Sequence, residues 1–115
     1  MEPKVTKWRI SFPLPTGVAT TITLYQSISD GEATSIKNAK TFKLDGGVEG
    51  KYFWERLGDA LRFGQQMGQT QIVRVRYEKK AAALFDRWTV LDGIGPARFA
   101  NEEQMNDGLL ELTLQ

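Results

Sequence analysis

The sequence contains no cysteine and no histidine among its 115 residues. Without cysteine there can be no disulfide bond, no thiolate catalysis and no cysteine-ligated zinc. Without histidine the chain lacks the commonest metal ligand, the usual general base and every histidine-containing catalytic triad. No Ser, Thr or Lys lies in a recognisable nucleophile motif. We therefore expect a protein that is not an enzyme and needs no cofactor.

Neither sign of charge predominates, because 15 Lys and Arg residues stand against 14 Asp and Glu residues. This balance gives no reason to expect a strongly basic nucleic-acid binder. Long hydrophobic runs are also missing, since no window approaches the roughly 18 apolar residues of a membrane span. The first residues are not followed by the apolar stretch of a signal peptide. We expect a protein without a membrane anchor that folds in a cytoplasm.

What is present favours one domain, residues 1–115, because a chain of this length encloses one core but not two. The expected class is α+β, mainly antiparallel β, as a small β-sandwich or barrel with one flanking α-helix. The chain divides into an N-terminal hairpin (5–28), a long loop (29–50), a helix (51–67) and C-terminal strands (70–115).

The N-terminal segments alternate apolar and polar residues, which is typical of half-buried strands. In residues 5–12, Trp8, Ile10 and Phe12 fall on one face. Residues 18–28 alternate in the same way, and the Pro- and Gly-containing segment between the two runs predicts a turn. The two runs are therefore expected to pair as an antiparallel hairpin.

Residues 29–50 carry four glycines, scattered charge and few large apolar groups, with a short strand possible over 41–44. A loop of this length in a small domain is usually functional or disordered. We therefore expect a contact segment here. The glycine-rich stretch 44–51 precedes the expected helix, but its spacing matches no phosphate-binding motif, so loop geometry is the favoured interpretation.

Residues 51–67 form the clearest helical pattern, with a stripe of apolar and small residues at helical spacing. We expect Gly58 and Gly64 to permit close packing against a sheet, and Gly68 to be a left-handed C-terminal cap. The stripe consists of Phe53, Leu57, Ala60, Leu61 and Gly64.

The C-terminal region predicts strands over 71–79, 81–91 and 109–115, with 97–106 an edge strand or an irregular segment. Turns are expected at 92–96 and 106–108. Large apolar side chains occur at both odd and even positions of 81–91, which point to opposite faces of a strand. We therefore expect both faces of that strand to be covered. In the last strand, Leu110, Leu112 and Leu114 point inward, and Glu111 and Thr113 point outward.

Two groups of charged residues are candidates for function. Arg74, Arg76, Lys79 and Lys80 lie close to Tyr77 and Trp88 in the sequence, a mixture that can bind single-stranded nucleic acid on a sheet. The favoured alternative is a solvated face whose arginines pair with Glu78 and Asp86. A second group is acidic, but it lies in turn-rich segments and is not expected to be catalytic. The acidic group comprises Asp92, Glu102, Glu103 and Asp107.

The order of elements over 45–115 resembles the tail tube protein family of long-tailed bacteriophages. The segment GKYFWERLGDALRFG runs directly into TQIVRVRYE. An aromatic strand with Phe85 and Trp88, the glycine turn DGIG, a polar stretch with Asn101 and the closing strand GLLELTLQ follow. The resemblance covers element order and contains no diagnostic motif.

The resemblance implies a structural virion protein, assembled in the host cytoplasm, whose copies form stacked hexameric rings. Its partners would be copies of itself, other phage tail proteins, and DNA that passes through the lumen without specific binding. The long loop would reach an adjacent subunit. Because such a lumen should be neutral or acidic, Arg74 and Arg76 would lie away from it, in salt bridges. A tail terminator or tail-tip protein is an alternative within this resemblance.

Two other functions stay open from the residues alone: a small β-barrel nucleic-acid-binding module, and a monomeric phage accessory or inhibitor protein. For the self-assembling protein, the residues expected to contact other copies are Asp30, Lys37, Lys40, Phe42, Lys43, Trp54, Arg74 and Arg76.

Overall fold

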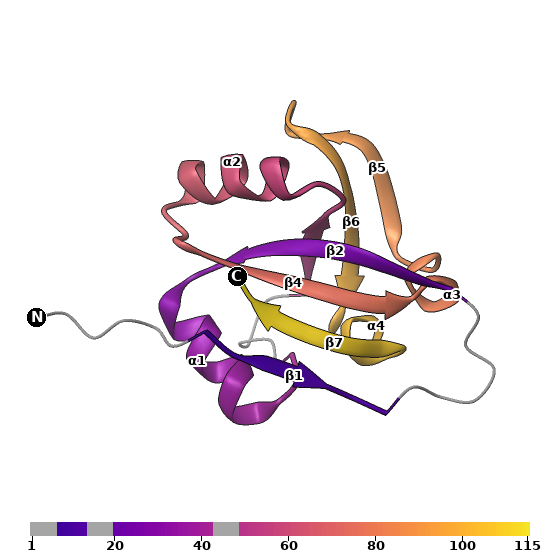
Figure 1. Ribbon diagram of the computed structural model, residues 1–115. Coiled ribbons are helices and arrows are strands. Elements are labelled where there is room, and N and C mark those ends of the chain that lie inside the picture. Colours follow the sequence, from indigo (N-terminus) through magenta and orange to yellow (C-terminus); the bar gives the residue numbers. More distant parts are fainter. Residues whose placement is uncertain (1–6, 14–19, 43–48) are drawn as a thin grey trace, which may run out of the picture.

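A computed structural model of the chain describes residues 7–13, 20–42 and 49–115, and its strands form one seven-stranded antiparallel sheet (Figure 1). The strand order is β1-β7-β4-β2-β3-β6-β5. The predicted class, α+β with mainly antiparallel strands, is confirmed. The elements are β1 (Arg9–Ser11), β2 (Thr21–Ile28), α1 (Asp30–Ala39), β3 (Gly50–Trp54), α2 (Leu57–Met67), β4 (Gln71–Glu78), α3 (Lys79–Ala82), β5 (Asp86–Leu91), β6 (Gly95–Asn101), α4 (Glu102–Asn106) and β7 (Leu109–Leu114).

The sheet consists of two parts, β1-β7-β4-β2 and β3-β6-β5, that are joined by one residue pair, Tyr25 and Trp54. Figure 1 shows β5 and β6 running across the direction of β2, β4 and β7. The main core contains residues from both parts, including Leu24, Val75 and Phe53. The sheet is therefore bent so that one face of each part packs on this shared core.

Four helices occur in the described part of the chain, where the sequence predicts one. Helices α1, α3 and α4 contribute Ile36, Ala82 and Met105 to the main core. Helix α2 covers a second cluster, in which Phe63 packs on Trp54 with ring centroids 5.3 Å apart. None of the helices in the described ranges has the length and apolar character that a membrane crossing needs.

The predicted N-terminal hairpin is wrong in its pairing, although its alternation is correct. Strand β1 pairs with β7, and β2 lies between β4 and β3. Trp8, Ile10 and Phe12 pack on the core, as the alternation predicts. Alternation determines which face of a strand is buried, but it does not determine which other strand is the neighbour.

The predicted loop over 29–50 is also wrong, because residues 30–39 form α1 and β3 begins at Gly50. A capping box starts α1: the Ser29 hydroxyl accepts from the Glu32 N–H, and the Glu32 carboxylate accepts from the Ser29 N–H. Lys40 ends the helix in the left-handed conformation, at φ 58°. Of the possible strand over 41–44, Thr41 and Phe42 are not strand, and residues 43 and 44 lie outside the described ranges.

The predicted helix 51–67 begins too early, because Gly50–Trp54 is a strand and α2 starts at Leu57. Phe53 and Trp54 are both fully buried, on opposite faces of β3, which a helix with one apolar stripe would not allow. Gly68 is the left-handed cap at φ 70°, as predicted. Gly64 packs tightly against the sheet, whereas a Cβ at Gly58 would meet no atom within 4 Å, so the packing role predicted for Gly58 is wrong.

The C-terminal predictions hold for β4, for β7 and for the turns at 92–96 and 106–108, but the predictions for residues 81–91 and 97–106 are wrong in part. The strand predicted over 81–91 starts at Asp86, after α3, and it is an exposed sheet edge instead of a strand covered on both faces. Residues 97–106 are not an edge strand either. Strand β6 lies between β3 and β5, and α4 follows it with a capping box from Asn101 and Gln104.

Candidate functional site

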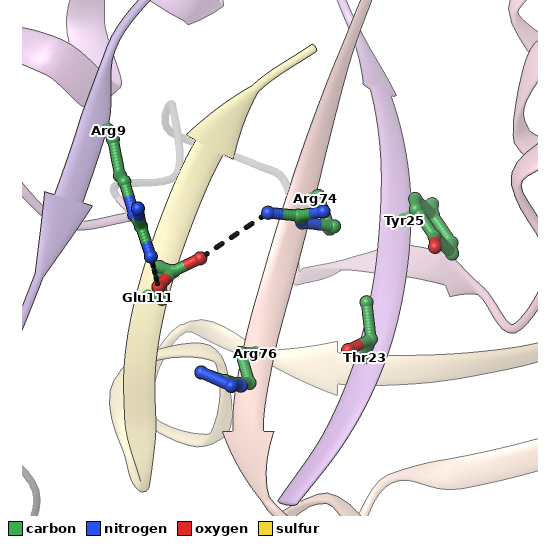
Figure 2. A pocket seen from close by; sticks show the side chains of 6 residues that line it. All are labelled: Arg9, Thr23, Tyr25, Arg74, Arg76 and Glu111. Carbon is green, nitrogen blue, oxygen red and sulfur yellow. Dashed lines mark hydrogen bonds and ion pairs between the residues drawn. The ribbon is translucent and has the colours of Figure 1, made fainter.

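On the outer face of β1-β7-β4-β2, away from the main core, α2 covers Ile72 at one end, and the rest carries a polar depression of about 260 Å³ (Figure 2). Cross-strand pairing builds it. Thr23 lies opposite Arg76 and Arg76 opposite Glu111, while Tyr25 lies opposite Arg74 in the neighbouring row. Paired residues of antiparallel strands point to the same side of the sheet, so their side chains gather there. The lining residues are Arg9, Thr23, Tyr25, Arg74, Arg76 and Glu111.

Glu111 is the central side chain of this depression and is only 8% exposed. Its Oε2 accepts from Arg9 Nη2 at 2.7 Å, and its Oε1 lies 3.6 Å from Arg74 Nη2. The Thr113 hydroxyl also donates to Oε1, at 3.2 Å. Both carboxylate oxygens are therefore engaged, and Glu111 ties the first strand and β4 to β7 (Figure 2).

Glu111 stays ionised because its surroundings stabilise the carboxylate. The hydrogen bond from Arg9 lowers the pKa of Glu111, with further lowering from Thr113 and from the charges of Arg9 and Arg76. Burial acts in the opposite direction, but the net direction is downward. At neutral pH the depression thus contains three guanidinium groups and one carboxylate, which leaves a charge of +2.

Arg76 is the arginine with the most freedom to bind something else. It is exposed, and it forms no ion pair with any residue in the described ranges. A guanidinium group carries five N–H donors in a fixed plane, so Arg9 and Arg74 also keep donors that Glu111 does not use. The arrangement is suited to holding an oxyanion. The described residues contain no group of three or more acidic side chains that could hold a metal ion.

The predicted basic stripe is only partly brought together. Arg74 and Arg76 share a face as expected, but Lys79 and Lys80 belong to α3, and Tyr77 is fully buried on the opposite face. Trp88 lies on β5, in the other part of the sheet. The partner of Arg74 is Glu111 rather than Glu78 or Asp86.

Sequence reasoning missed Arg9 and Glu111 as members of this site. Alternation places both on polar strand faces, which is the available signal. However, 102 positions separate them, and only the pairing of β1 with β7 brings them into contact.

Two of the residues expected to contact other copies are buried in this chain's own core. Phe42 is 4% exposed and packs edge-on against Phe53, and Trp54 is fully buried under α2. Large aromatic side chains of a small domain are needed for its own core, which is why these two are not surface groups.

The other expected contact residues occupy different places. Asp30 accepts hydrogen bonds from Thr70 and Gln71, and Lys37 and Lys40 are exposed at the end of α1. Lys43 lies outside the described residues. Arg74 and Arg76 lie in the depression described above.

The acidic residues near the C-terminus do not form one site. Asp92 lies in the turn before β6, whereas Glu102 and Glu103 begin α4 after that strand. Because β6 lies between them, Asp92 and the two glutamates are at opposite ends of a strand. They cannot act together as paired catalytic carboxylates.

A second surface feature is the exposed edge of the sheet at β5. Along this strand Trp88 is 39% and Val90 60% exposed. Trp88 packs edge-on against Tyr52, with ring centroids 5.8 Å apart, and Tyr52 packs against Phe99. An edge strand has backbone N–H and C=O groups without a neighbouring strand, and it is a surface for pairing with another chain.

Scans against protein-family models, against curated proteins and against solved structures find no match for the chain.

Proposed function

We propose that the protein is a structural subunit that assembles with copies of itself through its sheet edges, as a ring-forming tail tube protein of a phage virion. The observation that carries the proposal is the exposed edge strand β5, on which Trp88 is partly exposed and Val90 is 60% exposed. The proposal assigns the chain no catalytic step and no cofactor.

The two edges of the sheet differ, which favours assembly in one direction. One edge is β5, with six residues, and the other is β1, with three residues. If β5 of one copy pairs with β1 of the next, the contact is head-to-tail and extends the sheet between copies. Head-to-tail contacts of this kind close into rings when the rotation between copies permits.

The remaining partners follow from the same proposal. Rings stack into a tube that conducts DNA without specific contacts, and other tail proteins cap its ends. In this arrangement the basic depression faces away from the lumen, because tightly held phosphates would hinder the passage of DNA.

The test is the mass of the purified chain in solution by light scattering, combined with negative-stain microscopy. We expect rings or tubes for the natural sequence. Val90→Lys places a charge on the β5 edge and should shift the protein to monomer. Met67→Lys, at an equally exposed apolar residue at the end of α2, is the matched control and should leave assembly intact.

Two results would count against the proposal. A natural chain that stays monomeric at millimolar concentration would remove self-assembly altogether. Assembly that survives Val90→Lys but is lost in Met67→Lys would move the contact from the sheet edge to α2.

The nucleic-acid-binding module is the second candidate function, because of a specific observation. Three arginines from β1 and β4 face the same depression on an open sheet surface. This function needs no association between copies, and binding by a monomer would distinguish it from a ring-forming subunit.

A further inference from the structure

We propose that the depression lined by Arg9, Arg74, Arg76 and Glu111 is a binding site for a phosphate group. The proposal is independent of self-assembly, because it concerns the outer face of the sheet and not its edges. It also identifies a ligand chemistry that the basic stripe of the sequence alone does not define.

The positions of the arginines suit a tetrahedral oxyanion. Arg74 and Arg76 lie two positions apart on β4 and point to the same side, so their Cα atoms are about 7 Å apart. Arg9 reaches the depression from β1, on the far side of β7, and is the third arginine around the space for the ligand. Arginine binds phosphate oxygens with pairs of parallel N–H donors, which a lysine cannot do.

Glu111 acts as a positioning residue for two of these arginines. Its carboxylate holds Arg9 at 2.7 Å and Arg74 at 3.6 Å, and its 8% exposure keeps it below the surface on which a ligand would lie. Side chains that are ordered before binding lose less conformational entropy when the ligand arrives. The carboxylate therefore orients the site rather than blocking it.

The charge and size of the depression favour a phosphate monoester over a carboxylate. The net charge of +2 matches a group that carries about −1.5 to −2 at neutral pH. The volume, about 260 Å³, lies below the range of pockets that enclose drug-sized ligands, so the site accommodates the phosphate and leaves the attached molecule in solvent. The hydroxyls of Thr23 and Tyr25 line the wall on β2 and supply further donors.

The experiment is an NMR titration of the full ¹⁵N-labelled chain at low ionic strength, with inorganic phosphate as the first ligand. We expect saturable shifts at Thr23, Arg74 and Arg76. Arg76→Gln should weaken phosphate binding by about tenfold, since it removes charge-assisted hydrogen bonds without breaking any ion pair in the described part of the chain. Its melting temperature should stay close to that of the natural chain, because Arg76 is exposed.

Lys37→Gln is the matched control, because it removes the same charge from an exposed position on α1 and should leave phosphate binding unchanged. Equal weakening by Lys37→Gln and Arg76→Gln would show general attraction to a cationic protein and overturn the site. An absence of saturable phosphate binding would overturn it as well.

The source of the phosphate is found by comparing short thymidine oligonucleotides with and without a 5′-phosphate. Tighter binding of the 5′-phosphorylated strand identifies a terminal monoester, and equal binding of both strands above that of inorganic phosphate identifies the nucleic-acid backbone. Shifts confined to residues outside the depression in all three titrations would contradict the proposal. None of these results depends on whether the chain forms rings, so this proposal and the proposed function can fail separately.

Discussion

Gly64 in α2 lies directly against Ser27 in β2, so closely that a Cβ on Gly64 would be 3.1 Å from the Ser27 Cβ. The same added atom would lie 2.9 Å from the carbonyl oxygen of Gln69, which is backbone and cannot move aside easily. Helix α2 therefore depends on glycine at this position to reach the sheet, and Phe63 beside it can then pack on Trp54.

Two glycine-to-alanine substitutions in α2 should change stability in opposite directions. Gly64→Ala should destabilise the protein by about 1–3 kcal/mol, because it overpacks the contact with Ser27. Gly58→Ala should stabilise it by about 0.5–1 kcal/mol, because no atom lies within 4 Å and alanine restricts the unfolded chain. Urea unfolding of both variants measures this, and stabilisation by both would contradict the tight packing of α2.

Tyr77 is expected to contribute through its hydroxyl as well as its ring. It is fully buried, and its hydroxyl donates to the carbonyl oxygen of Met105 at 2.7 Å. Tyr77→Phe keeps the ring contacts with Phe53 and Phe85 but leaves that carbonyl without its donor. We expect a loss of about 1–2 kcal/mol in the free energy of unfolding. No measurable change would mean that this hydrogen bond adds nothing to stability.

Tyr77 should also make the protein sensitive to alkali. Burial raises the pKa of Tyr77 well above the ordinary tyrosine value of about 10. A group whose pKa is higher in the folded state stabilises the protein below its unfolded pKa, and this stability is lost as the pH rises further. The free energy of unfolding should therefore decrease above about pH 10, and less so in Tyr77→Phe. Identical alkaline profiles for both proteins would contradict this.

Asn106 holds the segment after α1 to α4, and aspartate should not replace it. Its amide Nδ2 donates to the carbonyls of Phe42 and Glu102, at 3.1 and 2.9 Å, while its Oδ1 accepts from the Phe42 N–H. Asn106→Asp removes both donors and sets a negative charge against two carbonyl oxygens. We expect a loss of about 2–3 kcal/mol by urea unfolding. Asn38→Asp, at an exposed position on α1, is the control and should cost far less.

Glu55 should make stability depend on pH in acid. Hydrogen bonds from Arg87, at 2.6 Å, and from Arg98, at 3.0 Å, lower the pKa of Glu55 despite its partial burial. A carboxyl whose pKa is lower in the folded state contributes stability above its unfolded pKa, about 4.3, and that stability is lost as the pH falls through the folded value.

Glu55→Gln should therefore cost about 1–3 kcal/mol at pH 7, and the difference from the natural chain should shrink by pH 3. Urea unfolding at both pH values measures it. Glu103→Gln is the matched control, because Glu103 is exposed and forms no ion pair in the described part of the chain. A difference for Glu55→Gln that is as large at pH 3 as at pH 7 would contradict the role of the carboxylate.

The sequence predicts strand faces well, because alternation and burial have the same physical cause. Val73, Val75 and Tyr77 of β4 enter the core, and Arg74 and Arg76 lie on the outer face, as their spacing indicates. The placement of Arg74 and Arg76 together in the candidate site was therefore predictable from the sequence. Arg9 and Glu111 were not predictable members, since alternation says nothing about which distant strand becomes the neighbour.

The missed helices have weak apolar periodicity but clear starting signals. Helix α1 buries only Ala33 and Ile36, which is too little for a convincing stripe. Ser29 and Glu32 form a capping box, as do Asn101 and Gln104 before α4. In segments this short the cap is a better guide to a helix than the hydrophobic pattern.

The pairing of β1 with β7 has a consequence for biosynthesis. A ribosome has to deliver the segment up to Leu114 before Arg9–Ser11 can find its neighbouring strand. Until then the nascent polypeptide exposes Trp8 and Ile10, which later pack on the interior. Folding of this sheet during translation therefore cannot be completed until β7 has been synthesised.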